Sequence, residues 1–168
     1  PLDADLDALV AFFADPAIAR WWPMDRDEIV TDVLERADPD VRVYIIEVEG
    51  ALGGVIQSHQ ETDEDYRHAG MDISVAPRFH GTGVAVDALR TLARHLIEHD
   101  GHHRLVIDPA AHNARAIACY RKLGFQPVGI LRRQHTDARV FGGGVYPEIR
   151  ASRCPRHVDD GMVEHAEA

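Results

Sequence analysis

The fold of this chain is decided by one stretch of sequence, Ile73-Ser74-Val75-Ala76-Pro77-Arg78-Phe79-His80-Gly81-Thr82-Gly83. It contains the end of a strand and a glycine loop, and it leads into apolar residues at helical spacing. Small residues before a helix leave backbone N–H groups open at the positive end of the helix dipole, so such a loop can bind a phosphate. Taken alone, the glycines fit a plain tight turn equally well. The loop is not a Walker A loop, since no Lys-Ser/Thr pair follows, nor a dinucleotide fingerprint, since Val86 replaces the third glycine.

The rest of the sequence places further helices and strands around this stretch. Two helices and a hairpin come before it, and a buried strand, a capped helix and a second pair of strands come after it. The predicted elements are helices at 5–14 and 27–37, strands at 41–48, 52–58 and 71–75, a helix carrying Leu89, Leu92, Ala93, Leu96 and Ile97, a strand at 104–108, a helix at 113–123, and strands at 125–131 and 145–152. This order predicts one mixed α/β domain.

The composition is typical of a single globular domain. Its 168 residues are 45% hydrophobic and 27% charged, and no apolar run approaches the roughly 20 residues that a membrane helix needs. The formal net charge of −10 argues against a nucleic-acid partner and favours a cationic small substrate. Two cysteines, Cys119 and Cys154, are too few for a disulfide framework. Such low cysteine use is typical of a reducing compartment, so we expect a cytoplasmic protein.

A literal metal motif occurs in the helix that follows the glycine loop. His95 and His99 frame an H-x-x-E-H sequence, the inverted zinc-protease signature. Leu92 and Leu96 already define the buried face of that helix, so both imidazoles are expected to face solvent. We therefore expect no metal site.

Other reactive side chains are interpreted as structural. Cys119 is expected to be a packing residue, because no His or acid beside it would lower the pKa of its thiol. His102 and His103 are expected at the surface, and the acidic residues at 61–65 are expected in a solvated loop. Lys122, the only lysine, is attributed to coding bias and not to a site.

Two motifs taken together resemble the GNAT superfamily of acetyl-CoA-dependent N-acetyltransferases. The stretch quoted first carries R-x-x-G-x-G, and residues 113–125 resemble the N-x-x-A-x-x-x-Y-x-x-x-G-F helix of that superfamily. The motifs stand in the family's order, about thirty residues apart, and the resemblance covers most of residues 5–153. Within the superfamily the chain is most similar to the aminoglycoside 6'-N-acetyltransferases, through Trp21-Trp22, Gly70-Met71-Asp72 and Asp108-Pro109.

The resemblance implies an α/β fold of GNAT type, with a central mixed, mostly antiparallel, twisted sheet flanked by helices. That sheet would be splayed between the strands that end near Val75 and Asp108. A single acetyltransferase domain would cover residues 1–154, with the family's first strand missing upstream of Leu2, and residues 155–168 would form a polar tail. The loop at 59–68 is short for one that clamps an antibiotic.

The resemblance also implies direct attack of an amine on the thioester of acetyl-CoA in a ternary complex. The pantetheine arm would lie like an added strand in the splay, and the pyrophosphate would bind to amides of the glycine loop. The implied cofactor-binding residues are Ile73, Ser74, Val75, His80, Gly81, Thr82, Gly83, Val84, Asn113 and Tyr120. A backbone N–H at or near Val75 would stabilise the oxyanion.

Two side chains are assigned to catalysis. Asp72 is interpreted as the base that takes a proton from the amine, with a substrate-holding anion as an equal alternative. Tyr120 is expected either to protonate the departing thiolate or to pack against the cofactor. The implied substrate-binding residues are Trp22, Glu64, Asp65, Asp72 and Asp108.

These assignments predict an aminoglycoside-type cationic amine as the acceptor, and with it a role in antibiotic resistance. Neither nucleic acid nor a membrane is an expected partner, and the chain is expected as a monomer or homodimer. Two alternatives stay open. One is a GNAT enzyme that acetylates a protein N-terminus, a lysine or a metabolite amine, and the other is a non-catalytic acyl-CoA-binding module.

Overall fold

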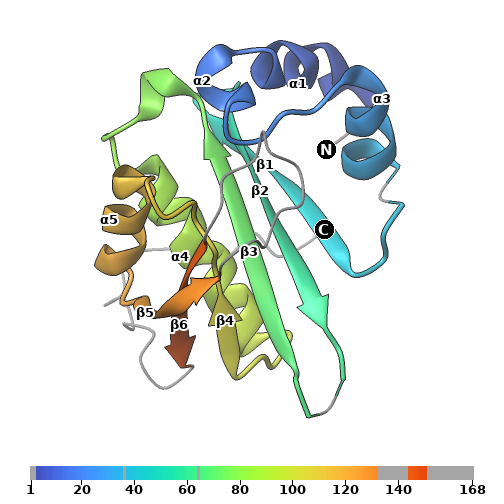
Figure 1. Cartoon of the computed structure of the whole chain (residues 1–168). Coiled ribbons are helices and arrows are strands. Elements are labelled where there is room, and N and C mark those ends of the chain that lie inside the picture. The colour runs from blue at the N-terminus through green and yellow to red at the C-terminus, as the bar shows by residue number, and fades with distance from the viewer. Residues whose placement is uncertain (1–2, 36, 64, 132–143, 151–168) are drawn as a thin grey trace, which may run out of the picture.

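The structure, a computed structural model of the chain, describes residues 3–35, 37–63, 65–131 and 144–150 (Figure 1). Its helices are α1 (Leu6–Phe13), α2 (Pro16–Ala19), α3 (Arg26–Glu28), α4 (Val84–Glu98) and α5 (Ala114–Lys122), with the 3-10 turns η1 (Asp3–Asp5) and η3 (Pro77–Phe79) and the π-helical turn η2 (Ile29–Leu34). Its strands are β1 (Val41–Val48), β2 (Ala51–Glu61), β3 (His68–Val75), β4 (Arg104–Val106), β5 (Gln126–Leu131) and β6 (Gly144–Arg150). Within these ranges no helix is long and apolar enough to cross a bilayer.

The strands form one six-stranded sheet in the order β1-β2-β3-β4-β6-β5. Of the described neighbours, only β3 and β4 run parallel, because helix α4 carries the chain back between them. Helices α4 and α5 cover one face, and α1, α2 and η2 cover the other (Figure 1). The predicted mixed, mostly antiparallel sheet flanked by helices is confirmed.

Strands β3 and β4 separate soon after they begin. Their pairing consists of Ala69 with Leu105 and Gly70 with Val106. In contrast, β3 pairs with β2 along its whole length. Figure 1 shows β3 continuing well past the end of β4. The predicted splay is confirmed, and it leaves the edge of β3 beyond Gly70 open to an added strand.

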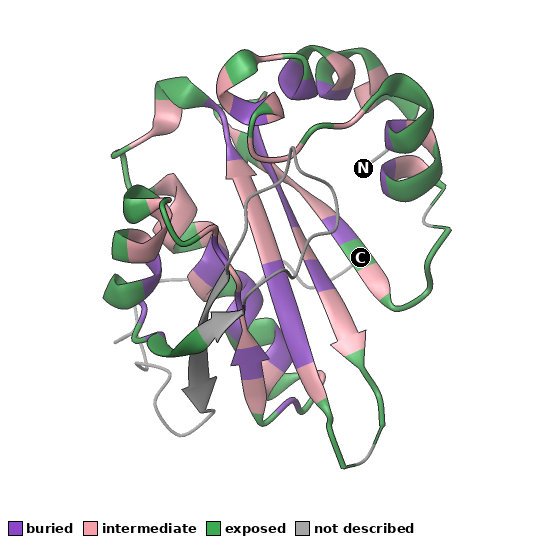
Figure 2. Cartoon of the chain, viewed as in Figure 1, coloured by how far each residue is buried: buried purple, intermediate pink, exposed green. Residues whose placement is uncertain are grey.

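Two apolar cores lie on opposite faces of the sheet (Figure 2). Side chains alternate along each strand, so Ile56 and Met71 pack with α4 and α5, whereas Val55 packs with α1 and η2. Each fully buried side chain of this size contributes about 1.5–3 kcal/mol to stability. The sheet therefore separates the two cores. Between the diverging ends of β3 and β4, side chains from both faces of the sheet can approach each other.

Capping residues explain where the N-terminal helices differ from prediction. The sequence predicted no helix between 14 and 27, but Asp15 accepts a hydrogen bond from the N–H of Ala17 at 2.8 Å and starts α2. The helix predicted at 27–37 begins earlier, at a capping box of Asp25 and Glu28, and continues as η2.

The C-terminal half follows the prediction with shorter elements. Strand β4 ends at Val106, not at 108, and β5 and β6 form the predicted antiparallel pair. Cys154 and the tail at 155–168 lie outside the described residues.

The surface position predicted for His102 is wrong. Its side chain is 2% exposed, and neither ring nitrogen has a hydrogen-bond partner in the described part of the chain. Burial lowers the pKa of His102, and the neighbouring Arg67 lowers it further. His103 is exposed, as predicted. Nothing in the local sequence separates His102 from His103, because Arg42, Arg67 and His68, which lie near the buried ring, come from distant parts of the chain.

Candidate active site

The glycine loop joins the end of β3 to the first turn of α4. Gly81 and Gly83 have φ angles of +82° and +100°, which other residues rarely adopt, and Gly83 caps α4. The Thr82 hydroxyl donates to the carbonyl of Phe79 at 2.8 Å, and Arg78 ties the loop to β2 through a hydrogen bond of 2.7 Å. The N-terminus of a 15-residue helix thus has a defined position, and its dipole favours an anion there.

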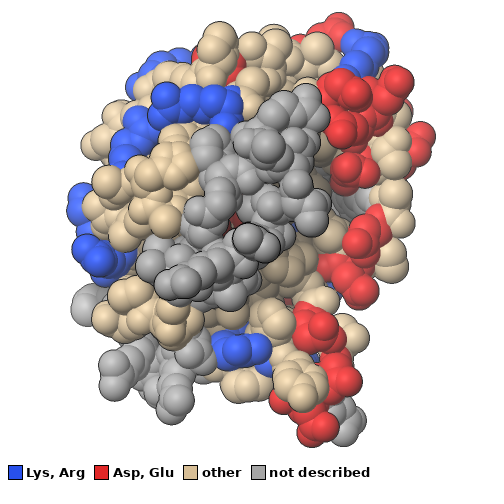
Figure 3. Space-filling view, viewed as in Figure 1, with Lys and Arg blue, Asp and Glu red and all other residues tan. Residues whose placement is uncertain are grey.

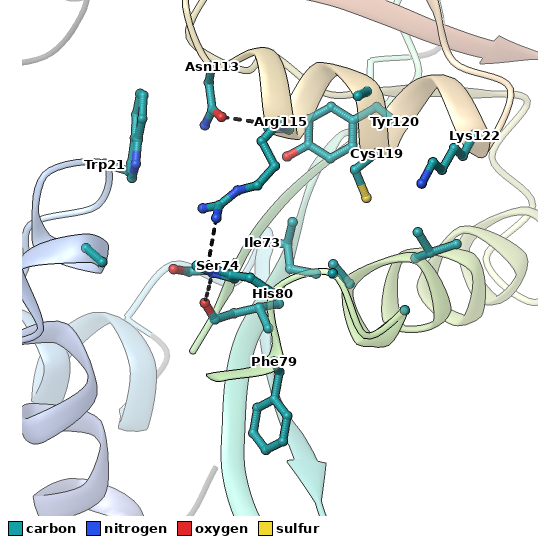
Figure 4. A pocket seen from close by; sticks show the side chains of 18 of the residues that line it. Trp21, Ile73, Ser74, Phe79, His80, Asn113, Arg115, Cys119, Tyr120 and Lys122 are labelled. Atoms are coloured by element: carbon teal, nitrogen blue, oxygen red, sulfur yellow. Dashed lines mark hydrogen bonds between the residues drawn. The ribbon is translucent and has the colours of Figure 1, made fainter. Parts of the chain in front are cut away.

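A cavity of about 360 Å³ opens beside this loop, between the end of β3, the start of α4 and helix α5 (Figure 4). Most of the residues expected to bind the cofactor line it, namely Ile73, Ser74, Val75, His80, Gly81, Gly83, Asn113 and Tyr120. Thr82 and Val84 belong to the loop but not to the lining. Asn113 also caps α5 by accepting the N–H of Ala116 at 3.2 Å.

The edge of β3 presents backbone groups to the gap beside β4. The N–H of Ala76 donates to the carbonyl of Gly53 on β2 at 2.8 Å. Backbone groups in an antiparallel ladder alternate in direction from one residue to the next, so those of Ser74 also face β2. The backbone groups of Ile73 and Val75 therefore face the gap. Of the three cofactor-binding residues predicted on this strand, Ile73, Ser74 and Val75, two direct their backbone groups at the gap.

One contact that the sequence analysis missed crosses the cavity from α5. Nη1 of Arg115 lies 2.8 Å from Nδ1 of His80, and Nε2 of His80 lies 2.8 Å from the carbonyl oxygen of Val75. A guanidinium only donates, so Nδ1 accepts and Nε2–H donates to Val75. Figure 4 shows Arg115 reaching across the cavity toward the end of β3. This arrangement occupies the carbonyl of Val75 and supports the end of β3.

Lys122 also lines the cavity, although the sequence analysis assigned it no site. Arg115, Cys119 and Lys122 are spaced i, i+4 and i+7, which puts them on one face of α5, and this spacing could have revealed them. Figure 3 shows basic side chains gathered on the side of α5 and acidic ones over the N-terminal helices and the β2–β3 hairpin. The cavity side of the molecule thus suits phosphates.

Tyr120 lines the cavity and belongs to the apolar core under α4 and α5. Its side chain is 7% exposed and packs edge-on against Phe125, with ring centroids 6.2 Å apart. Burial raises the pKa of Tyr120 far above its ordinary value, and the carboxylates of Asp72 and Asp108 are close enough to raise it further. Tyr120 is therefore a neutral phenol at any physiological pH.

Asp72 lies on the opposite face of β3 from the apolar core under α4. Its Oδ2 accepts a hydrogen bond from Nε2 of Gln57 at 3.1 Å and lies 3.7 Å from Nδ1 of His59. The side chain is 38% exposed, so an acceptor in solution can reach it. Asp108 follows the end of β4 by two residues, and its carboxylate is close enough to Tyr120 to raise the pKa of that phenol.

The other substrate residues are distributed differently from the prediction. Trp22 packs against Phe13, with ring centroids 5.7 Å apart, and belongs to the core under α1. Trp21 lines the cavity in its place. Asp65 lies in the β2–β3 turn, at the opposite end of β3 from the glycine loop, and Glu64 lies outside the described residues.

The side chains interpreted as structural behave as packing or surface groups. Burial raises the pKa of Cys119, more than Lys122 lowers it, so the thiol is a weak nucleophile that packs against the core under α4. His95 and His99 are exposed, as predicted. No group of three His, Cys, Asp or Glu side chains in the described ranges could hold a metal ion.

The comparisons with known proteins agree with this geometry. The chain belongs to the GNAT acetyltransferase family, because the family described as "Acetyltransferase (GNAT) domain" matches residues 1–132. It is therefore an N-acetyltransferase by family. Among curated protein sequences, none matches the chain well enough to count as a relative.

Solved structures with the same fold include enzymes with three kinds of acceptor. Aminoglycoside acetyltransferase AAC(6')-Ib in complex with coenzyme A and kanamycin is 24% identical, with a TM-score of 0.74 over 89% of this chain and 91% of that one. Spermidine N-acetyltransferase from Vibrio cholerae with CoA and spermine is 19% identical, with a TM-score of 0.74 over 90% and 92%. Ribosomal-protein-alanine N-acetyltransferase from Brucella melitensis is 24% identical, with a TM-score of 0.72 over 88% and 94%.

Proposed function

We propose that this protein transfers the acetyl group of acetyl-CoA to a primary amine of a small polycation of aminoglycoside type. The observation that carries the proposal is the splay. It brings the cavity beside the glycine loop, whose lining includes Tyr120, close to the carboxylates of Asp72 and Asp108, which both act on that phenol. Such an arrangement suits a reaction between an anionic acyl donor and a cationic acceptor.

The residues of the cavity fit the parts of acetyl-CoA. The amides of the glycine loop and the dipole of α4 would hold the pyrophosphate, with Arg115 and Lys122 nearby to neutralise phosphate charge. The backbone N–H and C=O of Ile73 would pair with the pantetheine arm. Because His80 already occupies the Val75 carbonyl, the N–H of Val75 is the group that we assign to the thioester oxygen.

The reaction requires a neutral amine and a stabilised leaving group. Asp72 would take the proton of the bound ammonium, after which the nitrogen bonds to the acetyl carbon and the carbon–sulfur bond breaks. The second nitrogen proton ends on the thiolate, so the products are an amide, a thiol and one proton released to solvent. The hydroxyl of Tyr120 would donate a hydrogen bond to the sulfur as charge develops there. Holding both reactants in the splay supplies a further large part of the acceleration.

A small polycation is favoured over a peptide because the accessible acidic groups lie on the acceptor side of the sheet. The basic side chains Arg115 and Lys122 line the opposite, cofactor side. Kanamycin and spermine occur with two of the structures that share this fold. Each carboxylate that meets an ammonium group contributes about 1.5–3 kcal/mol through a charge-assisted bond.

The test is a steady-state screen that measures thiol release from acetyl-CoA with kanamycin, with spermine and with a peptide that begins with alanine. Kanamycin or spermine should be preferred, and Asp108→Asn should raise the KM for that amine about tenfold or more while keeping the KM for acetyl-CoA. Asp87→Asn, on the first turn of α4, is the matched control and should change neither KM for the amine nor turnover. Preference for the peptide would overturn the acceptor class and leave the family chemistry intact.

A further inference from the structure

A polar cluster on the acceptor face of the sheet surrounds the proposed base. Gln57 stands opposite Asp72 in the pairing of β2 with β3, and His59 stands opposite Gly70. All four residues lie on the face that α1 and η2 cover only in part, since the side chains of His59 and Asp72 are 46% and 38% exposed. The sequence analysis assigned no role to Gln57 or His59.

Gly70 gives the His59 ring a defined place. A Cβ added at Gly70 would overlap the ring at Nε2, Cε1 and Cδ2, so the imidazole lies directly over the bare backbone of the neighbouring strand. Gly70 has an ordinary extended φ, so its backbone does not require glycine. The missing side chain therefore makes room for the ring, and any other residue at position 70 would displace it.

The ring and the Gln57 amide act on the same carboxylate oxygen. Nε2 of Gln57 donates to Oδ2 of Asp72 at 3.1 Å, and Nδ1 of His59 lies 3.7 Å from that same oxygen. Hydrogen bonds around a catalytic group are often long without substrate and shorten in the complex. The hydrogen bond from Gln57 restricts the rotation of the carboxylate, and Nδ1 of His59 lies beside the same oxygen, just beyond hydrogen-bond distance.

We propose that His59 is a positioning residue for Asp72: seated over Gly70, it acts with Gln57 on Oδ2 so that Oδ1 meets the acceptor amine. This inference rests on the proposed role of Asp72 as the base. The position of a base matters because a misplacement of about 1 Å can reduce turnover about 100-fold. Gly70 is then part of the same device, since it determines where the ring lies.

The test compares four variants, His59→Ala, His59→Asn, Gly70→Ala and the double variant Gly70→Ala with His59→Ala, in initial-rate assays with acetyl-CoA and kanamycin or spermine. His59→Ala and Gly70→Ala should each lower kcat about 10- to 100-fold, with the KM for acetyl-CoA unchanged. His59→Asn should keep most of the activity, because the amide nitrogen of Asn takes nearly the place of Nδ1. The double variant should be no slower than His59→Ala, because without the ring the added methyl displaces nothing.

Two matched controls exclude general damage. His99→Ala removes the exposed histidine that caps the C-terminus of α4, and Gly129→Ala adds a methyl on β5 where nothing lies within 4 Å. Both should turn over at the wild-type rate and melt at the wild-type temperature. A Gly70→Ala protein with wild-type kcat, a double variant whose losses multiply, or a His59→Asn protein as slow as His59→Ala would each overturn the proposal.

A second readout does not depend on the acceptor. The imidazole ring signals of His59 in NMR spectra, recorded at fixed pH, should move both in Gly70→Ala and in Asp72→Asn, but not in Gly129→Ala. If the wild type acetylates neither amine, the proposed acceptor fails, while these signals still decide the placement of His59. Signals that stay unchanged in Gly70→Ala and Asp72→Asn would overturn it.

Discussion

Replacing Tyr120 with phenylalanine removes one buried hydroxyl from the lining of the cavity and leaves the ring against Phe125 in place. Transfer of a proton from a phenol of ordinary pKa near 10 to a thiolate near 8.5 is uphill by about 2 kcal/mol. Burial and the carboxylates of Asp72 and Asp108 raise the pKa of Tyr120 further, so complete transfer becomes still less favourable. We therefore expect the hydroxyl to stabilise the departing thiolate through a hydrogen bond.

The size of the effect follows from that assignment. A hydrogen bond to a charged group contributes about 1.5–3 kcal/mol, which corresponds to a loss of about 10- to 150-fold in kcat for Tyr120→Phe. The KM for acetyl-CoA should stay the same, because the bond forms only as charge develops. Tyr44→Phe, at the edge of the same core, is the matched control and should not change kcat.

The pH dependence provides an independent check of the same reasoning. Since the pKa of Tyr120 is raised, the phenol stays protonated to at least pH 10, and the profiles of kcat against pH should have the same shape in wild type and Tyr120→Phe. The assay is steady-state thiol release between pH 6 and about pH 10. Equal kcat in the two proteins would refute the hydrogen-bond role, and an alkaline fall below pH 10 that disappears in Tyr120→Phe would refute the burial argument.

Three further changes test the cavity and the core. Gly83→Val puts a branched side chain at a φ of +100°, which costs about 1–2 kcal/mol of stability. This variant should bind acetyl-CoA about tenfold or more weakly in calorimetry. An unchanged affinity in a folded protein would exclude the loop as the phosphate site. Arg115→Met should also weaken acetyl-CoA binding, whereas Arg121→Met, at an exposed position of the same helix, should not. Equal acetyl-CoA affinities in these two variants would show that the hydrogen bond between Arg115 and His80 is dispensable for acetyl-CoA binding. Because burial lowers the pKa of His102, its unfolded form binds a proton that the folded form excludes, so stability falls as pH drops below about 6.5, by up to about 1.4 kcal/mol per pH unit. In urea unfolding, the free energy of unfolding should fall less between pH 7.5 and pH 5.5 in His102→Leu than in wild type. The same fall in both proteins would contradict a lowered pKa for His102.

The order of elements and most of the residues that line the cavity could be predicted from sequence, because both depend on local chemistry. Strand, glycine loop and helix follow one another without interruption, and positive φ at Gly81 and Gly83 is a property of those residues themselves. Asn113 caps α5 and Gly124 ends it with a φ of +90°, again as short-range signals indicated. The spacing along α5 would also have revealed Arg115 and Lys122, had it been applied to polar side chains.

The acceptor side depended on contacts between segments that are far apart in the sequence. Neighbouring Trp21 and Trp22 are equivalent in sequence, and only the packing of Trp22 against Phe13 leaves Trp21 to the cavity. His59 and Gly70 meet because β2 and β3 pair in one register, and a shift by one residue would put the ring on the other face. The burial of His102 is likewise a product of tertiary packing. The sequence by itself determined the elements, their order and the glycine loop, since these follow from backbone preference and periodicity over a few residues. Strand register and the packing of helices on the sheet decided which side chains face the acceptor, because those positions are set by the burial of apolar surface across the whole chain.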